Sequence, residues 1–79
     1  MRDLTKVKGT IAYHFNQNID LLFSCGDDVE KMRSISLQLL EDKDLTDNKA
    51  VNEAKAILST VPTFKFCSVL GTYLTGIRV

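Results

Sequence analysis

Two stretches near the start of the chain, residues 6–15 and 19–25, alternate between the two faces of an extended backbone. In the first stretch, one face holds Val7, Gly9, Ile11, Tyr13 and Phe15, and the other holds Lys6, Lys8, Thr10, Ala12 and His14. In the second stretch, one face holds Ile19, Leu21, Phe23 and Cys25, and the other holds Asp20, Leu22 and Ser24. A period of two residues is typical of a half-buried β-strand. The alternation therefore predicts two strands with their large apolar side chains on one face.

The sequence NQN at residues 16–18 predicts a tight hairpin loop between these strands. Asparagine tolerates the left-handed backbone region that such a loop needs, and Asn18 is the candidate for that position. The resulting register gathers the large apolar side chains of both strands on one side. It also sets His14 opposite Asp20 on the outer face, and we interpret these two residues as a cross-strand pair that supports the hairpin.

After the second predicted strand, apolar residues recur every three or four positions, which is typical of helices. Asp27, followed three residues later by Glu30, predicts the start of a first helix through an acidic form of the capping box. A second helix is predicted to begin at Thr46 or Asp47 and to end before Pro62, which pushes the preceding residue out of helical geometry. The two apolar stripes are Val29, Met32, Ile35, Leu39 and Leu40, and Ala50, Ala54, Ile57, Leu58 and Val61.

Residues 63–79 are dense in β-branched and aromatic side chains and are predicted to be extended. Gly71 and Gly76 leave open whether they form one long bulged strand or two strands joined near Gly71, and we favour two. The predicted fold is α+β, a single domain over residues 1–79 in the order β-β-α-α-β-(β). Its N-terminal antiparallel hairpin belongs to a three- to four-stranded sheet, with two helices packed on one face.

Composition excludes several functional classes. Ten basic and ten acidic residues cancel, so no overall field directs the protein to nucleic acid or to an anionic membrane. Cys25 and Cys67 form no C-x-x-C pair and are too few for a disulfide scaffold. The chain starts without a secretion signal, and no apolar run approaches the about 20 residues of a membrane span. We therefore expect a cytoplasmic protein without a cofactor, a metal or a membrane partner.

Residues 42–53, DKDLTDNKAVNE, resemble the calcium loop of an EF-hand. The first, third, fifth, seventh and twelfth places of such a loop are occupied here by Asp42, Asp44, Thr46, Asn48 and Glu53. Asp47 stands where that loop has its glycine, and Lys49 replaces the usual apolar residue after Asn48. The resemblance implies a cation site, whereas an acidic linker that caps the second helix explains the same residues. We interpret the segment as a linker, and the sequence leaves cation binding open.

An enzyme is not expected, because His14 has no nucleophile or pocket beside it on the predicted outer face. Nucleic-acid binding is an alternative function. The predicted sheet segments carry three excess positive charges and residues 27–60 carry three excess negative charges. Basic residues that would collect on the sheet beside a tyrosine are Lys6, Lys8, Lys65 and Arg78.

A protein partner is the preferred prediction. Leu22, Leu37, Val69, Leu70 and Leu74 exceed what one helix-on-sheet layer buries, and a terminal edge strand invites pairing with a second chain. We therefore predict a small non-enzymatic protein-interaction, regulatory or inhibitor module whose partner is another protein or a second copy of itself. The candidate contact residues are Lys8, His14, Asp20, Leu22 and Arg78. By analogy, small proteins without motifs are often accessory proteins of phages and mobile elements.

Overall fold

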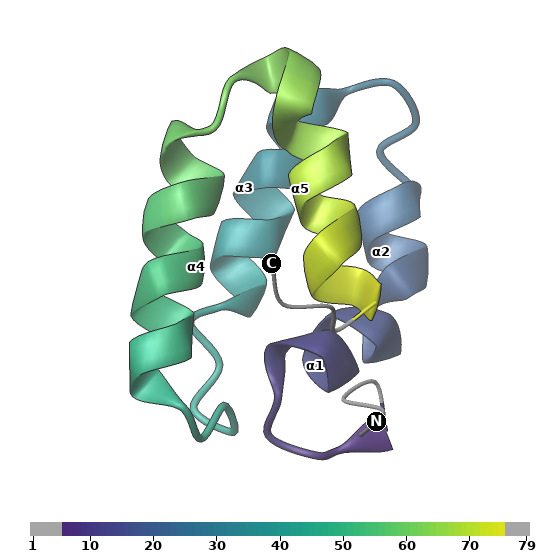
Figure 1. Cartoon of the computed structure of the whole chain (residues 1–79). Coiled ribbons are helices and arrows are strands. Elements are labelled where there is room, and N and C mark those ends of the chain that lie inside the picture. The colour runs from purple at the N-terminus through teal and green to yellow at the C-terminus, as the bar shows by residue number, and fades with distance from the viewer. Residues whose placement is uncertain (1–5, 76–79) are drawn as a thin grey trace.

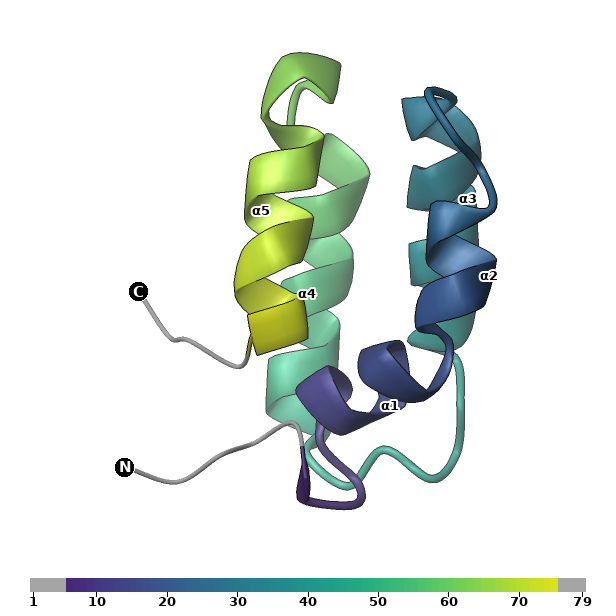
Figure 2. The same cartoon turned by 90° about the vertical axis from the view of Figure 1, so that its right-hand side faces the viewer.

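A computed structural model of the chain describes residues 6–75, which form five helices and no β-strand (Figure 1). The helices are α1 (Ile11–Gln17), α2 (Ile19–Phe23), α3 (Val29–Leu39), α4 (Asn48–Thr60) and α5 (Thr63–Thr75). Figure 2 shows α2 beside α3 in one layer and α4 beside α5 in the other, with α1 lying across one end. The predicted α+β fold, with its hairpin and sheet, is therefore wrong, and residues 6–75 are all-helical.

Two short helices, α1 and α2, replace the predicted hairpin. Thr10 caps α1, because its hydroxyl oxygen accepts a hydrogen bond from the Tyr13 N–H at 3.2 Å. Ala12 and Phe15 are both buried, at the three-residue spacing of one helix face. Two helical turns are too short to display a full helical period, so the same residues also fitted the period of a strand.

Asn18 joins α1 to α2. Its side-chain amide donates to the His14 carbonyl oxygen at 2.8 Å, and its backbone N–H donates to the Phe15 carbonyl oxygen at 3.1 Å. Both bonds complete the end of α1. Asn18 has a φ of −116°, so the prediction of a left-handed loop residue here is wrong.

The two predicted helices are confirmed as α3 and α4. Asp28, one residue later than predicted, caps α3 by accepting a hydrogen bond from the Lys31 N–H at 3.1 Å. Asp47 caps α4 in the same way from the Ala50 N–H, also at 3.1 Å. Helix α4 ends at Thr60, and the residue before Pro62 has the extended backbone that proline imposes.

Helix α5 occupies the residues that were predicted to be strands. Phe66 and Leu70 are buried, and three further side chains at helical spacing pack against the core: Val69, Tyr73 and Leu74. This packing overrides the strand preference of the β-branched and aromatic residues, which depends on context. Gly71 lies inside the helix, so the predicted bulge or turn there is wrong; Gly76 lies outside the described residues.

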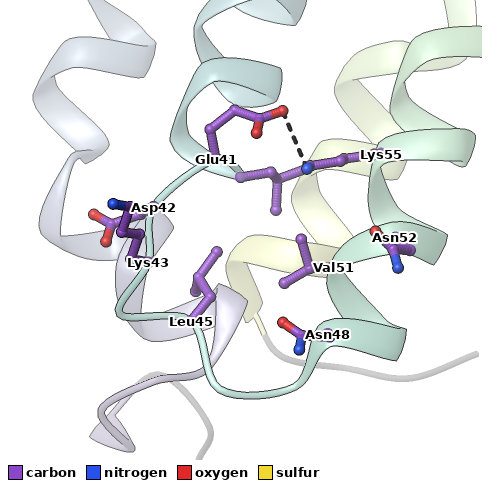
Figure 3. A pocket seen from close by; sticks show the side chains of 9 residues that line it. Glu41, Asp42, Lys43, Leu45, Asn48, Val51, Asn52 and Lys55 are labelled. Atoms are coloured by element: carbon purple, nitrogen blue, oxygen red, sulfur yellow. Dashed lines mark ion pairs between the residues drawn. The ribbon is translucent and has the colours of Figure 1, made fainter.

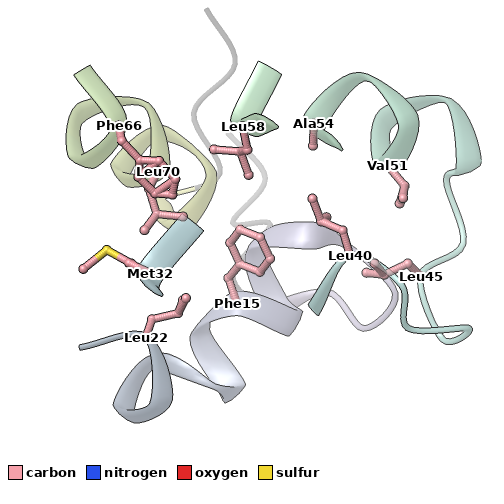
Figure 4. Packing of buried hydrophobic residues seen from close by; sticks show 10 residues of the cluster. All are labelled: Phe15, Leu22, Met32, Leu40, Leu45, Val51, Ala54, Leu58, Phe66 and Leu70. Carbon is pink, nitrogen blue, oxygen red and sulfur yellow. The ribbon is translucent and has the colours of Figure 1, made fainter. Parts of the chain in front are cut away.

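The core is built from all five helices (Figure 4). Phe15 and Leu22 come from α1 and α2, and they meet Met32 of α3, Leu58 of α4 and Phe66 of α5. Each large side chain buried in this way contributes about 1.5–3 kcal/mol through the hydrophobic effect. No helix within residues 6–75 is long and apolar enough to cross a membrane.

Neutral hydrogen bonds join α1 to the end of α5, and join the turn before α1 to the segment between α3 and α4. The side-chain amide of Asn16 donates to the carbonyl oxygens of Leu74, at 2.6 Å, and of Ala12, at 2.8 Å. The Thr46 N–H donates to the Gly9 carbonyl oxygen at 3.1 Å. Gly9 has a φ of +89°, and a Cβ on it would lie 3.0 Å from the Thr46 side chain, so this approach requires glycine.

Candidate functional site

The short helix α2 exposes large apolar side chains on the outside of the molecule. Leu22 is fully buried, whereas Leu21 is 49% exposed and Phe23 is 58% exposed. Successive residues on a helix are about 100° apart, so Leu21 and Phe23 flank the buried Leu22 on either side. Asp20 and Ser24 then point away from the core. We refer to Asp20, Leu21, Phe23 and Ser24 as the α2 face.

Local hydrogen bonds hold the end of α2. The Ser24 N–H donates to the Asp20 carbonyl oxygen at 2.9 Å, and the Ser24 hydroxyl donates to the Leu21 carbonyl oxygen at 2.7 Å. Gly26, with a φ of +60°, then turns the chain toward α3. Helix α2 packs along α3, and Figure 2 shows it at the outer edge of that layer.

The chain around the α2 face is acidic. Residues 9–30 contain four carboxylates and neither lysine nor arginine. Two of the carboxylates have partners, because Asp28 caps α3 and Glu30 pairs with Arg33 at 3.2 Å. Asp20 and Asp27 are exposed, and neither forms an ion pair with another of residues 6–75. The α2 face therefore combines two apolar side chains with a carboxylate that lacks a cation partner in this part of the chain.

A further exposed apolar side chain lies at the start of α5. Phe64 is 82% exposed, and the Lys65 Nζ lies 5.7 Å from the centre of its ring. Phe66 is fully buried, and two residues on a helix are about 200° apart, so Phe64 points into solvent. We refer to Phe64 and Lys65 as the α5 tip.

Arg33 connects the start of α5 to the rest of the molecule. Its guanidinium donates to the Leu58 carbonyl oxygen at 2.7 Å and to the Glu30 carboxylate at 3.2 and 3.3 Å. The guanidinium carbon also lies 5.1 Å from the centre of the Phe66 ring. The Thr63 hydroxyl donates to Glu30 at 2.8 Å. The hydrogen bond from Thr63, followed by that from Arg33, lowers the pKa of Glu30 below its ordinary value of 4.5.

The predicted pair of His14 and Asp20 does not form. The His14 Nε2 lies 3.4 Å from the Asp42 Oδ2, so the imidazole links α1 to the segment between α3 and α4. This nitrogen is buried, and within residues 6–75 it has no hydrogen-bond partner. Asp20 lies instead on the α2 face.

The other predicted contact residues have different outcomes. Lys8 is exposed in the turn before α1. Leu22 was expected on an outer face, but it is fully buried in the core and is therefore not a contact residue. Arg78 lies outside the described residues. The segment of Lys6 and Lys8 and the start of α5 with Lys65 lie at opposite ends of the molecule (Figures 1 and 2), so these lysines form no common basic surface.

A hollow of about 490 Å³ lies between the α3–α4 linker and α4 (Figure 3). It is lined by Leu40, Glu41, Asp42, Lys43, Leu45, Asn48, Val51, Asn52 and Lys55. The Lys55 Nζ pairs with the Glu41 Oε1 at 3.1 Å, which ties the linker to α4. The lining includes no hydroxyl, thiol or imidazole side chain, so it cannot form a Ser–His or Cys–His nucleophilic pair.

The segment that resembles an EF-hand loop has a structural role. Helix α4 begins at Asn48, so the second half of residues 42–53 is helical rather than a loop. Asp47 caps α4, and the Asp42 carboxylate accepts a hydrogen bond from the Asp44 N–H at 2.8 Å. Among residues 6–75, no three His, Cys, Asp or Glu side chains are placed to hold a metal ion.

No family model, curated protein or solved structure matches this chain. The sequence analysis missed both exposed features, because it placed Leu21 and Phe23 on a buried strand face and Phe64 in a strand. The helical spacing of Phe66 and Leu70 was the available signal, since it places Phe64 on the opposite side of a helix.

Proposed function

We propose that the protein is a non-enzymatic interaction module that binds a protein partner through the α2 face. The observation that supports this most strongly is the exposure of Leu21 and Phe23, 49% and 58%, on the two sides of one short helix. Two large apolar side chains exposed on one five-residue helix are a concentration of apolar surface, and such concentrations are more typical of interaction sites than of an ordinary solvated surface. Removing them from water on binding contributes about 25 cal/mol for each Å² of apolar surface.

Two further observations support a binding module rather than an enzyme. The His14 imidazole lies against Asp42, and His14 is not among the residues that line the hollow. The hollow itself has no Ser–His or Cys–His pair among its lining residues. A cytoplasmic location remains part of the proposal, and the two free thiols, Cys25 and Cys67, are consistent with it.

Site-specific photo-crosslinking tests the proposal. A photoreactive phenylalanine analogue replaces Phe23 in the full chain, which is expressed in cells of the organism that makes it. We expect a covalent adduct with a protein, because the ring at this position lies in the contact. A matched chain with the analogue at Ser59, an exposed residue of α4, serves as the control. Absence of a protein adduct at position 23, or equal adducts at both positions, would overturn the proposal.

Nucleic-acid binding is the competing function, and the same experiment detects it as an adduct that nuclease removes. A second measurement is the affinity for a short oligonucleotide at several salt concentrations. A steep loss of affinity with salt would support nucleic-acid binding, because released counterions drive such contacts. We expect no such dependence, because the lysines before α1 and Lys65 do not share a surface.

A further inference from the structure

The α2 face and the α5 tip have complementary chemistry. The α2 face presents two apolar side chains around the Asp20 carboxylate. The α5 tip presents one aromatic ring, Phe64, with the Lys65 ammonium beside it. An aromatic ring packs favourably against apolar side chains, and an ammonium is attracted to a carboxylate. Both surfaces therefore present apolar side chains, and their charges have opposite signs.

The α5 tip is held in place before any contact forms. Phe66 anchors the helix in the core, and the Thr63 hydroxyl bonds to Glu30 of α3. Because this short segment is already ordered, binding costs little additional backbone entropy. The acidic group nearest the tip, Glu30, is paired with Arg33, so its charge is compensated within the same molecule.

The tip does not rest on the α2 face of its own chain. Phe64 is 82% exposed, which leaves its ring in solvent. Figure 2 shows α5 in the layer with α4, and α2 in the opposite layer with α3. A contact between tip and face therefore requires two molecules.

We infer that the α5 tip of one copy binds the α2 face of a second copy, with Phe64 against Phe23 and with Lys65 beside Asp20, because Asp20 and Phe23 are neighbours three residues apart on that helix. The inference rests on the proposed function, because it names the partner of the α2 face. The two surfaces differ, so the contact is heterologous and each pair retains one unoccupied tip and one unoccupied face. Repeated contacts of this kind form a ring when the rotation from one copy to the next closes on itself, and a filament when it does not.

The first test is light scattering after size-exclusion chromatography of the full chain, over concentrations from about 10 µM to about 1 mM. We expect the average mass to rise with concentration, and we expect F64A and D20K each to weaken assembly at least about tenfold. I57A is the matched control, because Ile57 is also an exposed large apolar residue but belongs to neither surface. A thermal melt of each variant separates lost contact from lost folding.

The decisive test mixes two variants that each keep one surface. F64A/K65E lacks the tip, and D20K/F23A lacks the face, so each should be monomeric alone. Mixing them leaves one intact tip and one intact face, and we expect a 1:1 dimer that grows no further. A wild-type chain that stays monomeric up to about 1 mM would overturn the inference, as would a mixture that fails to pair while the wild type assembles.

The outcomes also separate the inference from the proposed function. If the wild type is monomeric but photo-crosslinking at position 23 captures a different protein, the proposed function stands, and the inference that the partner is a second copy is wrong. If no protein is captured at position 23 and no assembly occurs, both fail.

Discussion

The two ends of helix α5 are joined to the rest of the molecule by different chemistry. Where α5 begins, charged groups make the links, since the Arg33 guanidinium and the Glu30 carboxylate together connect three helices. Where α5 ends, neutral amides make them, since Asn16 donates to the Leu74 carbonyl oxygen. Charged contacts depend on pH and salt, and neutral hydrogen bonds depend on them far less. We therefore expect mutations and acid to affect the stability of the two ends differently.

The largest expected effect comes from breaking the charged end. R33A removes the donor to the Leu58 carbonyl oxygen and leaves Glu30 without its cation. Because the lost hydrogen bond had a charged donor, we expect a loss of about 1.5–3 kcal/mol in the free energy of unfolding, measured by urea denaturation. R33K is the matched control and should fall between the wild type and R33A, because it retains the charge without the planar fork. A loss below about 0.5 kcal/mol for R33A would contradict this role.

A smaller effect is expected at the neutral end. N16A leaves the Leu74 carbonyl oxygen without its side-chain donor, and we expect a loss of about 1–2 kcal/mol. Amide hydrogen exchange should become faster in the last turn of α5 and stay unchanged at Glu30. Q17A, an exposed neighbour in the same helix, is the control and should leave both unchanged. If amide exchange in N16A became equally faster at both ends, the two ends would not be independently stabilised.

The smallest effect is the acid dependence of the charged end. The pKa of Glu30 is lower in the folded chain than its ordinary value of 4.5, so the ionised carboxylate stabilises the fold at higher pH. This contribution is complete above pH 4.5 and is lost as the pH falls through the lower, folded pKa. E30Q should remove that part of the acid dependence of the free energy of unfolding. N16A should keep it, and an unchanged acid dependence in E30Q would contradict the assignment.

The helices that the sequence predicted correctly are long enough to show a complete period. Helix α4 has 13 residues, an aspartate cap at Asp47 and a proline stop at Pro62, and all three signals agree. Helices α1 and α2 have 7 and 5 residues, so period two and period 3.6 could not be told apart. Helix α5 was missed because its β-branched and aromatic residues outweighed the helical spacing of Phe66 and Leu70.

Because residues 19–23 were predicted to be a strand, their buried and exposed side chains were also assigned the wrong way round. On a strand, Leu21 and Phe23 share one face and Leu22 takes the other. On the helix, Leu22 is the buried residue and its two neighbours flank it in solvent. The predicted contact residue, Leu22, is therefore buried, and its two sequence neighbours are the exposed residues. Asp20 is on the outer surface in both descriptions.

The bond from Asn16 to the Leu74 carbonyl oxygen spans 58 positions of the chain, and α1 packs against α5 more extensively than against any other helix. Proteins are made from the amino terminus onward, so α1 leaves the ribosome long before the helix that covers it. The Phe15 side chain cannot be fully buried until residues 63–75 have left the ribosome. Folding of the nascent chain thus cannot finish before α5 has left the ribosome, and a ribosome stalled earlier would hold an intermediate with an uncovered first helix.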